Sequence, residues 1–185
     1  MRAIDRSAAF SSRRASASFR SMAIRDARVD DLPAIVEIYN MAIPGRMATA
    51  DLTPISVDSR RSWFVEHTPG IRPLWVVDEA ADIRGWLSFQ SFYGRPAYSA
   101  TAEVSVYVSP KHHRGGYGRA LLAHAVDRAP SMGLKTLLGF IFGHNEPSLA
   151  LFRRFGFETW AHLPRVAKLD GIECDVLILG LRLTD

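Results

Sequence analysis

One stretch of the chain, Glu103 to Leu122, reads EVSVYVSPKHHRGGYGRALL. Its first half has valines at every second position, alternating with Ser105 and Tyr107, and this period of two is typical of a β-strand. Pro110 ends the strand, and apolar residues then recur at helical spacing to about Ala129. A glycine-rich turn therefore connects a strand directly to the N-terminus of an amphipathic helix.

The turn has the composition of a phosphate-binding loop. Backbone N–H groups at a helix N-terminus lack helical partners, and the helix dipole favours negative charge there. A P-loop requires Lys and then Ser or Thr after its last glycine, but Gly118 is followed by Arg119 and Ala120. A dinucleotide-binding turn requires a small residue where Leu121 stands. The pyrophosphate loop of acyl-coenzyme A transferases, Gln/Arg-x-x-Gly-x-Gly/Ala, fits Gly116 and Gly118, and a turn without any ligand is the alternative.

Composition places the chain among ordinary globular proteins. Its 185 residues suit one domain, and 48% hydrophobic and 23% charged residues are usual values. The net charge of +4 comes from residues 1–21, which hold five arginines and one acidic residue. Removing these from the 23 basic and 19 acidic residues leaves 18 of each. The remaining residues have no net charge and no recognisable nucleic-acid-binding motif, which argues against a nucleic-acid partner.

The first 21 residues are expected to form a disordered basic leader before a domain at 22–185. A transit peptide, an expression remnant and a natural start at Met22 are open alternatives. No segment approaches the roughly 18 apolar residues of a membrane span. The single cysteine, Cys174, excludes an internal disulfide framework and a multi-cysteine metal site, so no metal is expected. These features predict a cytoplasmic protein without membrane contacts.

Hydrophobic periodicity predicts a mixed α/β sheet in a single domain. Before the central strand, the pattern predicts a strand at 23–28 and a helix capped by Asp30 or Asp31. A second helix is predicted at 57–67, and a hairpin is predicted with strands at 74–77 and 83–92. After the central helix, the pattern predicts a buried strand of the parallel type at 136–142 and a short helix from about 145, ended by Gly156. Two closing strands are predicted at 157–168 and 174–183.

Together these motifs resemble the GNAT superfamily of N-acetyltransferases. The shared features are Val-Tyr-Val-Ser-Pro and the glycine loop within 103–122, Gly-His-Asn-Glu-Pro-Ser at 143–148, and Phe-Gly-Phe at 155–157. The chain looks most like the phosphinothricin and methionine sulfoximine acetyltransferases, over about residues 24–183. The resemblance implies a single-domain GNAT fold: a mixed, mostly antiparallel sheet splayed around the central strand, with helices on both faces and acetyl-coenzyme A (acetyl-CoA) in a V-shaped cleft.

The resemblance also implies which residues bind acetyl-CoA. The pantetheine arm would pair with the backbone of the central strand, and the pyrophosphate would lie on the N–H groups of the glycine loop. His113 departs from the family's Gln or Arg at the first loop position. An ordinary helix cap is the alternative role for Asn145. The implied residues are Val106, Tyr107, Val108, Arg114, Gly115, Gly116, Tyr117, Gly118, Arg119, Asn145, Ser148 and Arg154.

For catalysis, the resemblance implies that Glu103 takes the proton of the acceptor amine, with a pKa raised by an apolar cleft. A surface charge at a strand end is the alternative for this residue. The N–H near Val106 would stabilise the oxyanion. Relatives place a tyrosine or histidine at the position of Phe152, which cannot donate a proton. The thiolate then leaves unaided or with help from Tyr107 or His144.

The implied acceptor is a small amino acid of the methionine sulfoximine, methionine sulfone or phosphinothricin type. Arg95 and Tyr98 match a substrate-contacting loop, and an arginine fork suits a carboxylate, although an exposed loop arginine is the alternative. Glu103 would face the same substrate, and residues 46–50 are expected to border the pocket. A protein or peptide α-amine acetyltransferase and a non-catalytic acetyl-CoA-binding module are the competing functions. The resemblance also suggests a homodimer.

Overall fold

A computed structural model describes residues 22–183, in which seven strands form one sheet in the order β1-β2-β3-β4-β5-β7-β6. The expected leader at 1–21 lies outside the described residues. Only β4 and β5 pair in parallel, and the other described pairs are antiparallel. The strands are β1 (Ala23–Asp26), β2 (Leu74–Glu79), β3 (Asp82–Ser91), β4 (Thr101–Val108), β5 (Thr136–Phe142), β6 (Glu158–Leu169) and β7 (Ile172–Arg182). The expected mixed, mostly antiparallel sheet is confirmed.

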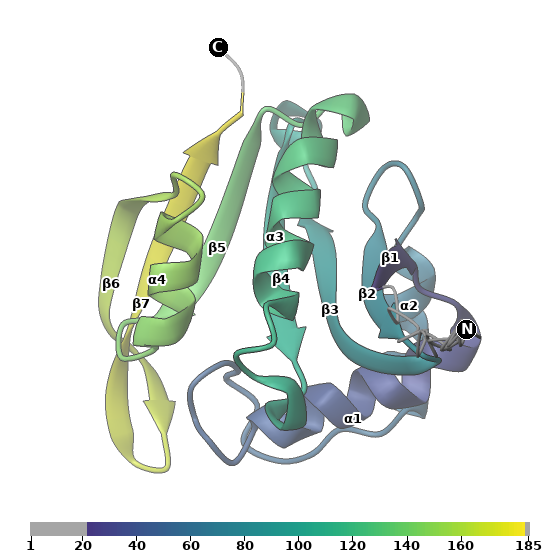
Figure 1. Ribbon diagram of the computed structural model, residues 1–185. Coiled ribbons are helices and arrows are strands. Elements are labelled where there is room, and N and C mark those ends of the chain that lie inside the picture. Colours follow the sequence, from purple (N-terminus) through teal and green to yellow (C-terminus); the bar gives the residue numbers. More distant parts are fainter. Residues whose placement is uncertain (1–21, 184–185) are drawn as a thin grey trace, which may run out of the picture.

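In the same residues, four α-helices cover both faces of the sheet. α3 and α4 lie on one face, and α1 and α2 lie on the other (Figure 1). Alternate residues of β2 and β3 point to opposite faces. Trp75, Val77 and Leu87 therefore pack with α3, whereas Val76 and Trp86 pack with α1. The helices are α1 (Leu32–Ala42), α2 (Arg61–Glu66), α3 (Tyr117–Arg128) and α4 (Glu146–Arg153).

The single parallel contact, between β4 and β5, is short. The two strands pair over three positions, the last of which sets Glu103 opposite Leu138. Beyond that pair the strands diverge toward their ends at Val108 and Phe142 (Figure 1). The backbone edge of β4 after Glu103 therefore has no strand partner in β5. The splayed central strand implied by the resemblance is present.

Asp31 occupies the N-cap position of α1 as expected, but the capping hydrogen bond and the expected length of the second helix are wrong. Asp31 does not cap α1 with its side chain, because its carboxylate accepts the N–H of Arg28 at 2.7 Å and binds the guanidinium of Arg25 at 2.7 Å. A 3₁₀ turn, Val29–Asp31, precedes α1 instead. The second helix was expected at 57–67, but a 3₁₀ turn, Asp58–Arg60, leads into a six-residue α2.

The closing hairpin follows the expected turn chemistry. Asp170 and Gly171 connect β6 to β7 with φ values of 49° and 91°, as a tight hairpin turn requires. Gly156 follows α4 with φ of 84°, the left-handed conformation of a helix C-terminal cap. No helix among residues 22–183 is both long and apolar enough to cross a bilayer.

Candidate active site

The free edge of β4 presents backbone groups in alternation. Ser109, which directly follows β4, donates its N–H to the carbonyl oxygen of Arg84 in β3 at 2.9 Å, so the odd-numbered residues of β4 direct their backbone groups toward β3. The N–H and C=O groups of Val106 and Val108 therefore point toward β5, beyond the last β4–β5 pair. These are the groups for which the sequence predicts contacts to pantetheine and to an oxyanion.

A cleft of about 400 Å³ lies where β4 and β5 separate. Among the residues expected to act, Glu103, Val106, Tyr107, Asn145 and Ser148 line it. The fold thus brings the expected base, the strand edge and the start of α4 into one cavity. The other lining residues include Met47, Ala48, Thr49, Ala50, Phe140, Phe142, Phe152, Ala167 and Val176.

Glu103 lies at the closed end of this cleft, since it belongs to the last β4–β5 pair. Its side chain is half-buried, and no described residue forms a side-chain hydrogen bond with it. Burial raises the pKa of the Glu103 carboxyl above its ordinary value. The expected direction of the pKa shift is confirmed, and it brings the basicity of the carboxylate closer to that required of a general base at neutral pH.

The glycine loop ends in an N–H cradle at the start of α3. The first helical hydrogen bond runs from the N–H of Ala120 to the oxygen of Gly116 at 2.9 Å. The four preceding N–H groups, those of Gly116, Tyr117, Gly118 and Arg119, are therefore outside the helical ladder. Gly116 has a φ of 83°, which a glycine adopts without strain. This conformation starts α3 and leaves the four donors at its end.

Gly115 has a different structural role from Gly116. Its N–H donates to the carbonyl oxygen of His112 at 3.2 Å, so it is already engaged within the loop. A Cβ atom on Gly115 would lie 2.5 Å from the ring of Tyr117. The Tyr117 hydroxyl donates to Glu79 at 2.8 Å and ties the loop to the β2–β3 hairpin. Glycine at 115 is thus required for close packing, while the cradle starts at Gly116.

His113, which departs from the family pattern, contacts the edge of β4. One ring nitrogen, Nε2, lies 3.1 Å from the carbonyl oxygen of Val108. The neighbouring Arg114 has a φ of 63° and an exposed side chain. The imidazole therefore binds the last residue of the strand and holds the turn that follows it.

Asn145 joins two parts of the site. Its Oδ1 accepts the N–H of Ser148 at 3.2 Å, which caps α4. Its Nδ2 donates to the carbonyl oxygen of Met47 at 2.7 Å. Asn145 is 6% exposed, so both bonds are shielded from water. The helix cap that the sequence left as an alternative is present, and the same side chain also lines the cleft.

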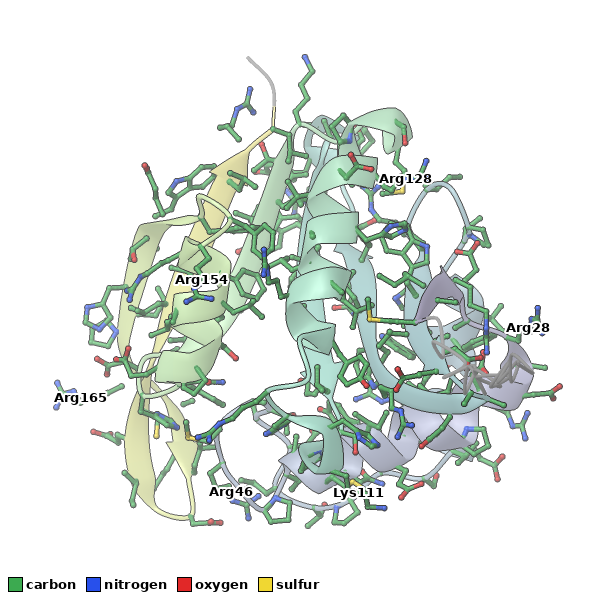
Figure 2. All side chains as sticks on the ribbon, in the orientation of Figure 1. Arg28, Arg46, Lys111, Arg128, Arg154 and Arg165 are labelled. Carbon is green, nitrogen blue, oxygen red and sulfur yellow. The ribbon has the colours of Figure 1, made fainter. Side chains whose placement is uncertain are left out.

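Residues 46–51, here called the crossing loop, span the two halves of the sheet. Arg46 binds both carboxylate oxygens of Asp170, in the β6–β7 turn, at 2.7 and 3.0 Å (Figure 2). On the other side, the Tyr107 hydroxyl donates to the oxygen of Ala48 at 2.8 Å, and the Tyr39 hydroxyl donates to Asp51 at 2.6 Å. The expectation that residues 46–50 border the pocket is supported, because residues 47–50 line the cleft.

Three expected residues stand apart from the cleft. Arg95 precedes the 3₁₀ turn between β3 and β4, Tyr98 is the last residue of that turn, and both are exposed. The Tyr98 ring packs against Phe92 and Tyr93 at centroid distances of 5.4 and 5.9 Å. Arg154 is exposed and caps the C-terminus of α4 (Figure 2). The roles implied for these three side chains remain predictions.

Sequence reasoning missed a second cavity, of about 190 Å³, between the sheet and α1 and α2. Its lining includes the aromatic side chains of Trp63 and Trp86. It also includes Ser88 and Gln90, two polar residues that alternate with Leu87 and Phe89 in β3. Their spacing of two was the available signal, because it places both on one face of the sheet.

Known proteins match most of the chain. Residues 33–157 match the family described as acetyltransferase (GNAT) family. Over 164 residues the chain is 46% identical to YwnH of Bacillus subtilis, provisionally named a phosphinothricin acetyltransferase, and the match covers 88% of this chain and 100% of that protein. Over 164 residues it is 34% identical to an L-methionine sulfoximine/L-methionine sulfone acetyltransferase of Pseudomonas aeruginosa, with coverage of 88% and 95%.

A solved relative has the same fold with the co-substrate bound. The phosphinothricin acetyltransferase of Sinorhizobium meliloti, in complex with acetyl-CoA, gives a TM-score of 0.82 at 30% identity, covering 87% of this chain and 88% of that one. The diverging strands and the N–H cradle described above thus belong to a fold that binds acetyl-CoA. The chain is a member of the GNAT family of acetyltransferases, and acetyl-CoA is its co-substrate.

Proposed function

We propose that the protein transfers the acetyl group of acetyl-CoA to the primary amine of a small amino acid, of the methionine sulfone, methionine sulfoximine or phosphinothricin type. The relatives that act on such acceptors match nearly their full length in this chain. The observation that carries the proposal is the half-buried Glu103 at the closed end of the cleft. The acceptor amine must lose a proton before it attacks, and this carboxylate is placed to take it.

Backbone groups hold the co-substrate in this proposal. Acetyl-CoA supplies the acetyl thioester. The N–H groups of Gly116, Tyr117, Gly118 and Arg119 lie at the helix end, where the dipole stabilises a pyrophosphate. The edge of β4 at Val106 and Val108 pairs with the pantetheine arm. The N–H of Val106 then donates to the acetyl oxygen as negative charge develops on it.

For the proton returned to the leaving sulfur, Tyr107 is a better candidate than His144. Tyr107 lines the cleft, whereas His144 is exposed, stacks on Phe142 and binds the carbonyl oxygen of Arg46. Burial raises the pKa of Tyr107, so its hydroxyl is protonated at neutral pH, and its proton has to leave the hydrogen bond to the oxygen of Ala48 to reach the sulfur. Phe152 is 4% exposed and packs its ring on Gly139. If Tyr107 donates, Tyr107→Phe lowers kcat.

Arg95 and Tyr98 are proposed to receive the acceptor's carboxylate. They belong to an exposed loop that leads directly into β4, and Glu103 is the third residue of that strand. In the described part of the chain, the Arg95 side chain forms no hydrogen bond or ion pair. Its donors are therefore available to a carboxylate.

The protein is further proposed to be a cytoplasmic homodimer without a nucleic-acid partner. Large exposed apolar side chains on the closing hairpin, Trp160, Val166 and Ile172, support a dimer surface there. The neutral balance of charge outside residues 1–21 disfavours nucleic acid. Light scattering of the purified chain, cell fractionation and a nucleic-acid filter assay test these three statements.

A thiol-release assay tests the proposed function. Acetyl-CoA is supplied with L-methionine sulfone, L-methionine sulfoximine, phosphinothricin, other free amino acids and short peptides. Turnover of a free amino acid that is lost in Arg95→Ala and in Glu103→Gln supports the proposal and the two assigned roles. Turnover of peptides alone moves the protein to α-amine acetylation of polypeptides. Acetyl-CoA binding without any turnover indicates a non-catalytic binding module.

A further inference from the structure

Four polar side chains form a row on the face of the sheet toward α1. Ser88 stands opposite Ser105, and Gln90 stands opposite Glu103, in the β3–β4 register. Ser88 is 1% exposed, yet none of the four forms a side-chain hydrogen bond with another described residue. Gln90, Glu103 and Ser105 are half-buried, and polar groups that lack a partner in the protein are suited to bind groups from outside the chain.

Three of these residues, Ser88, Gln90 and Ser105, form the polar part of the cavity of about 190 Å³. The rest of its wall is mostly aromatic or aliphatic: Ile35, Tyr39, Ile55, Trp63, Trp86 and Tyr107. Pockets for drug-sized ligands are larger, roughly 300–1,000 Å³. The cavity therefore suits one compact group, such as the side chain of an amino acid.

Arg60 is the charged residue in this lining. Its guanidinium lies 4.9 Å from the ring centroid of Tyr39 and 5.4 Å from that of Trp63. Its Nη2 forms an ion pair with the Asp51 carboxylate at 3.6 Å, which is too long for a hydrogen bond. The guanidinium forms no hydrogen bond to the described residues, so stacking positions it while its donors stay available.

The cavity and the acetyl-CoA cleft adjoin each other. Tyr39, Ser105 and Tyr107 line both of them. Gln90 is the cross-strand neighbour of Glu103, with Cβ atoms about 4.5–5.5 Å apart in such pairs. Ser105 follows Glu103 on the same face of β4, about 6.6 Å along the strand. An amino acid whose amine lies at Glu103 can therefore extend its side chain into the cavity.

We propose that this cavity is the side-chain subsite for the acceptor, and that Arg60 selects side chains that end in S=O or P–O oxygens. Arg60 donates to those oxygens, the aromatic rings surround the carbon stem, and Ser88 and Ser105 bind the remaining polar atoms. This inference rests on the proposed function, in which Arg95 holds the carboxylate. It adds a second arginine at the opposite end of the acceptor.

The test compares two acceptors that differ only in the oxygens on sulfur, L-methionine sulfone and L-methionine. The variant Arg60→Met keeps an unbranched stem, and Arg61→Met is the matched control. Arg61 is the next residue, is 62% exposed and pairs only with Asp58 among its described neighbours. A charged donor to a polar group is worth about a 10- to 100-fold change in kcat/KM. Arg60→Met should lower kcat/KM for the sulfone by that factor and for L-methionine by less than about threefold.

Folding of the variants is checked by thermal unfolding and by calorimetric binding of acetyl-CoA, both of which should match Arg61→Met. Arg60→Lys is a second variant, which keeps the charge and should recover part of the preference for the sulfone. Equal losses with both acceptors would assign Arg60 to a group they share, such as the carboxylate, and overturn the inference. So would an Arg60→Met variant that behaves like Arg61→Met. Failure of the unaltered enzyme to acetylate these two amino acids, L-methionine sulfoximine and phosphinothricin would instead remove the proposed function itself.

Discussion

The side-chain amide of Asn145 donates to the carbonyl oxygen of Met47 at 2.7 Å and thereby links α4 to a loop 98 positions earlier in the chain. The same side chain caps α4 through the N–H of Ser148. One residue thus sets both the start of the helix beside the cleft and the position of the crossing loop.

Two substitutions separate these contributions. Asn145→Ser keeps a helix-capping oxygen but is too short to reach Met47, whereas Asn145→Ala loses both bonds. We expect Asn145→Ala to lower the free energy of unfolding by about 1 kcal/mol more than Asn145→Ser, the usual worth of a cap. Both variants should speed hydrogen exchange in residues 46–51. Slow exchange there in Asn145→Ser would show that other contacts, such as Arg46 with Asp170, hold the loop.

Glu103→Gln should lower activity and raise stability. Loss of a general base costs about 100- to 10,000-fold in kcat/KM. Burial raises the pKa of Glu103, so the charged carboxylate is disfavoured in the folded state, and the neutral amide removes that penalty. Glu158→Gln, an exposed position on β6, is the control and should change neither quantity. The contradicting result is a Glu103→Gln variant that unfolds at a lower temperature at neutral pH.

The pH dependence of this difference has a definite sign. A carboxyl whose folded-state pKa is raised contributes stability that is fully present below its unfolded-state pKa and is lost as pH rises through the folded-state pKa. The stability gained by Glu103→Gln should therefore shrink as pH falls through the raised folded-state pKa of Glu103, and it should be absent below the ordinary glutamate pKa. In the same range kcat/KM of the unaltered enzyme should fall, because the protonated base cannot accept a proton. Unfolding midpoints and initial rates at several pH values measure both effects.

Gly116→Ala and Gly118→Ala should act in opposite directions on stability. Gly116 has φ of 83°, a conformation that costs an alanine about 1–2 kcal/mol, and it begins the N–H cradle. A Cβ on Gly118 would meet Leu151 and Val108 at 3.5 Å, which is ordinary contact, and alanine favours the helix. Gly116→Ala should therefore lower the unfolding midpoint and weaken acetyl-CoA binding in calorimetry. A lowered midpoint in Gly118→Ala alone would contradict this assignment.

Local patterns predicted the parts of the site that are local in the chain. The alternation in β4, the turn before α3 and the glycine after α4 each depend on neighbouring residues, so sequence spacing identified them. Sequence spacing alone could not distinguish the structural role of Gly115 from that of Gly116. Gly115 accommodates the ring of Tyr117, whereas Gly116 supplies a left-handed φ, and only the packed loop distinguishes these requirements.

The contacts that shape the acceptor side depend on distant segments. Arg46 meets Asp170 across 124 positions, and the row of Ser88 and Ser105 exists only once the β3–β4 register is known. Sequence reasoning did not identify Arg60 as a binding residue for a related reason. Its 3₁₀ turn was expected to be part of a longer helix, which would place its side chain differently. Sequence reasoning therefore identified the acetyl-CoA side more completely than the acceptor side.

The short pairing of β4 with β5 leaves a cleft that adjoins the cavity on the other face of the sheet, and in the proposed function one reactant approaches from each face. The N–H cradle belongs to the surface covered by α3 and α4, and the acceptor cavity to the surface covered by α1 and α2. Neither reactant has to leave before the other arrives, and Glu103 lies where the two meet. We therefore expect a ternary complex, with intersecting lines in double-reciprocal plots and no exchange of label between acetyl-CoA and coenzyme A when the amine is withheld.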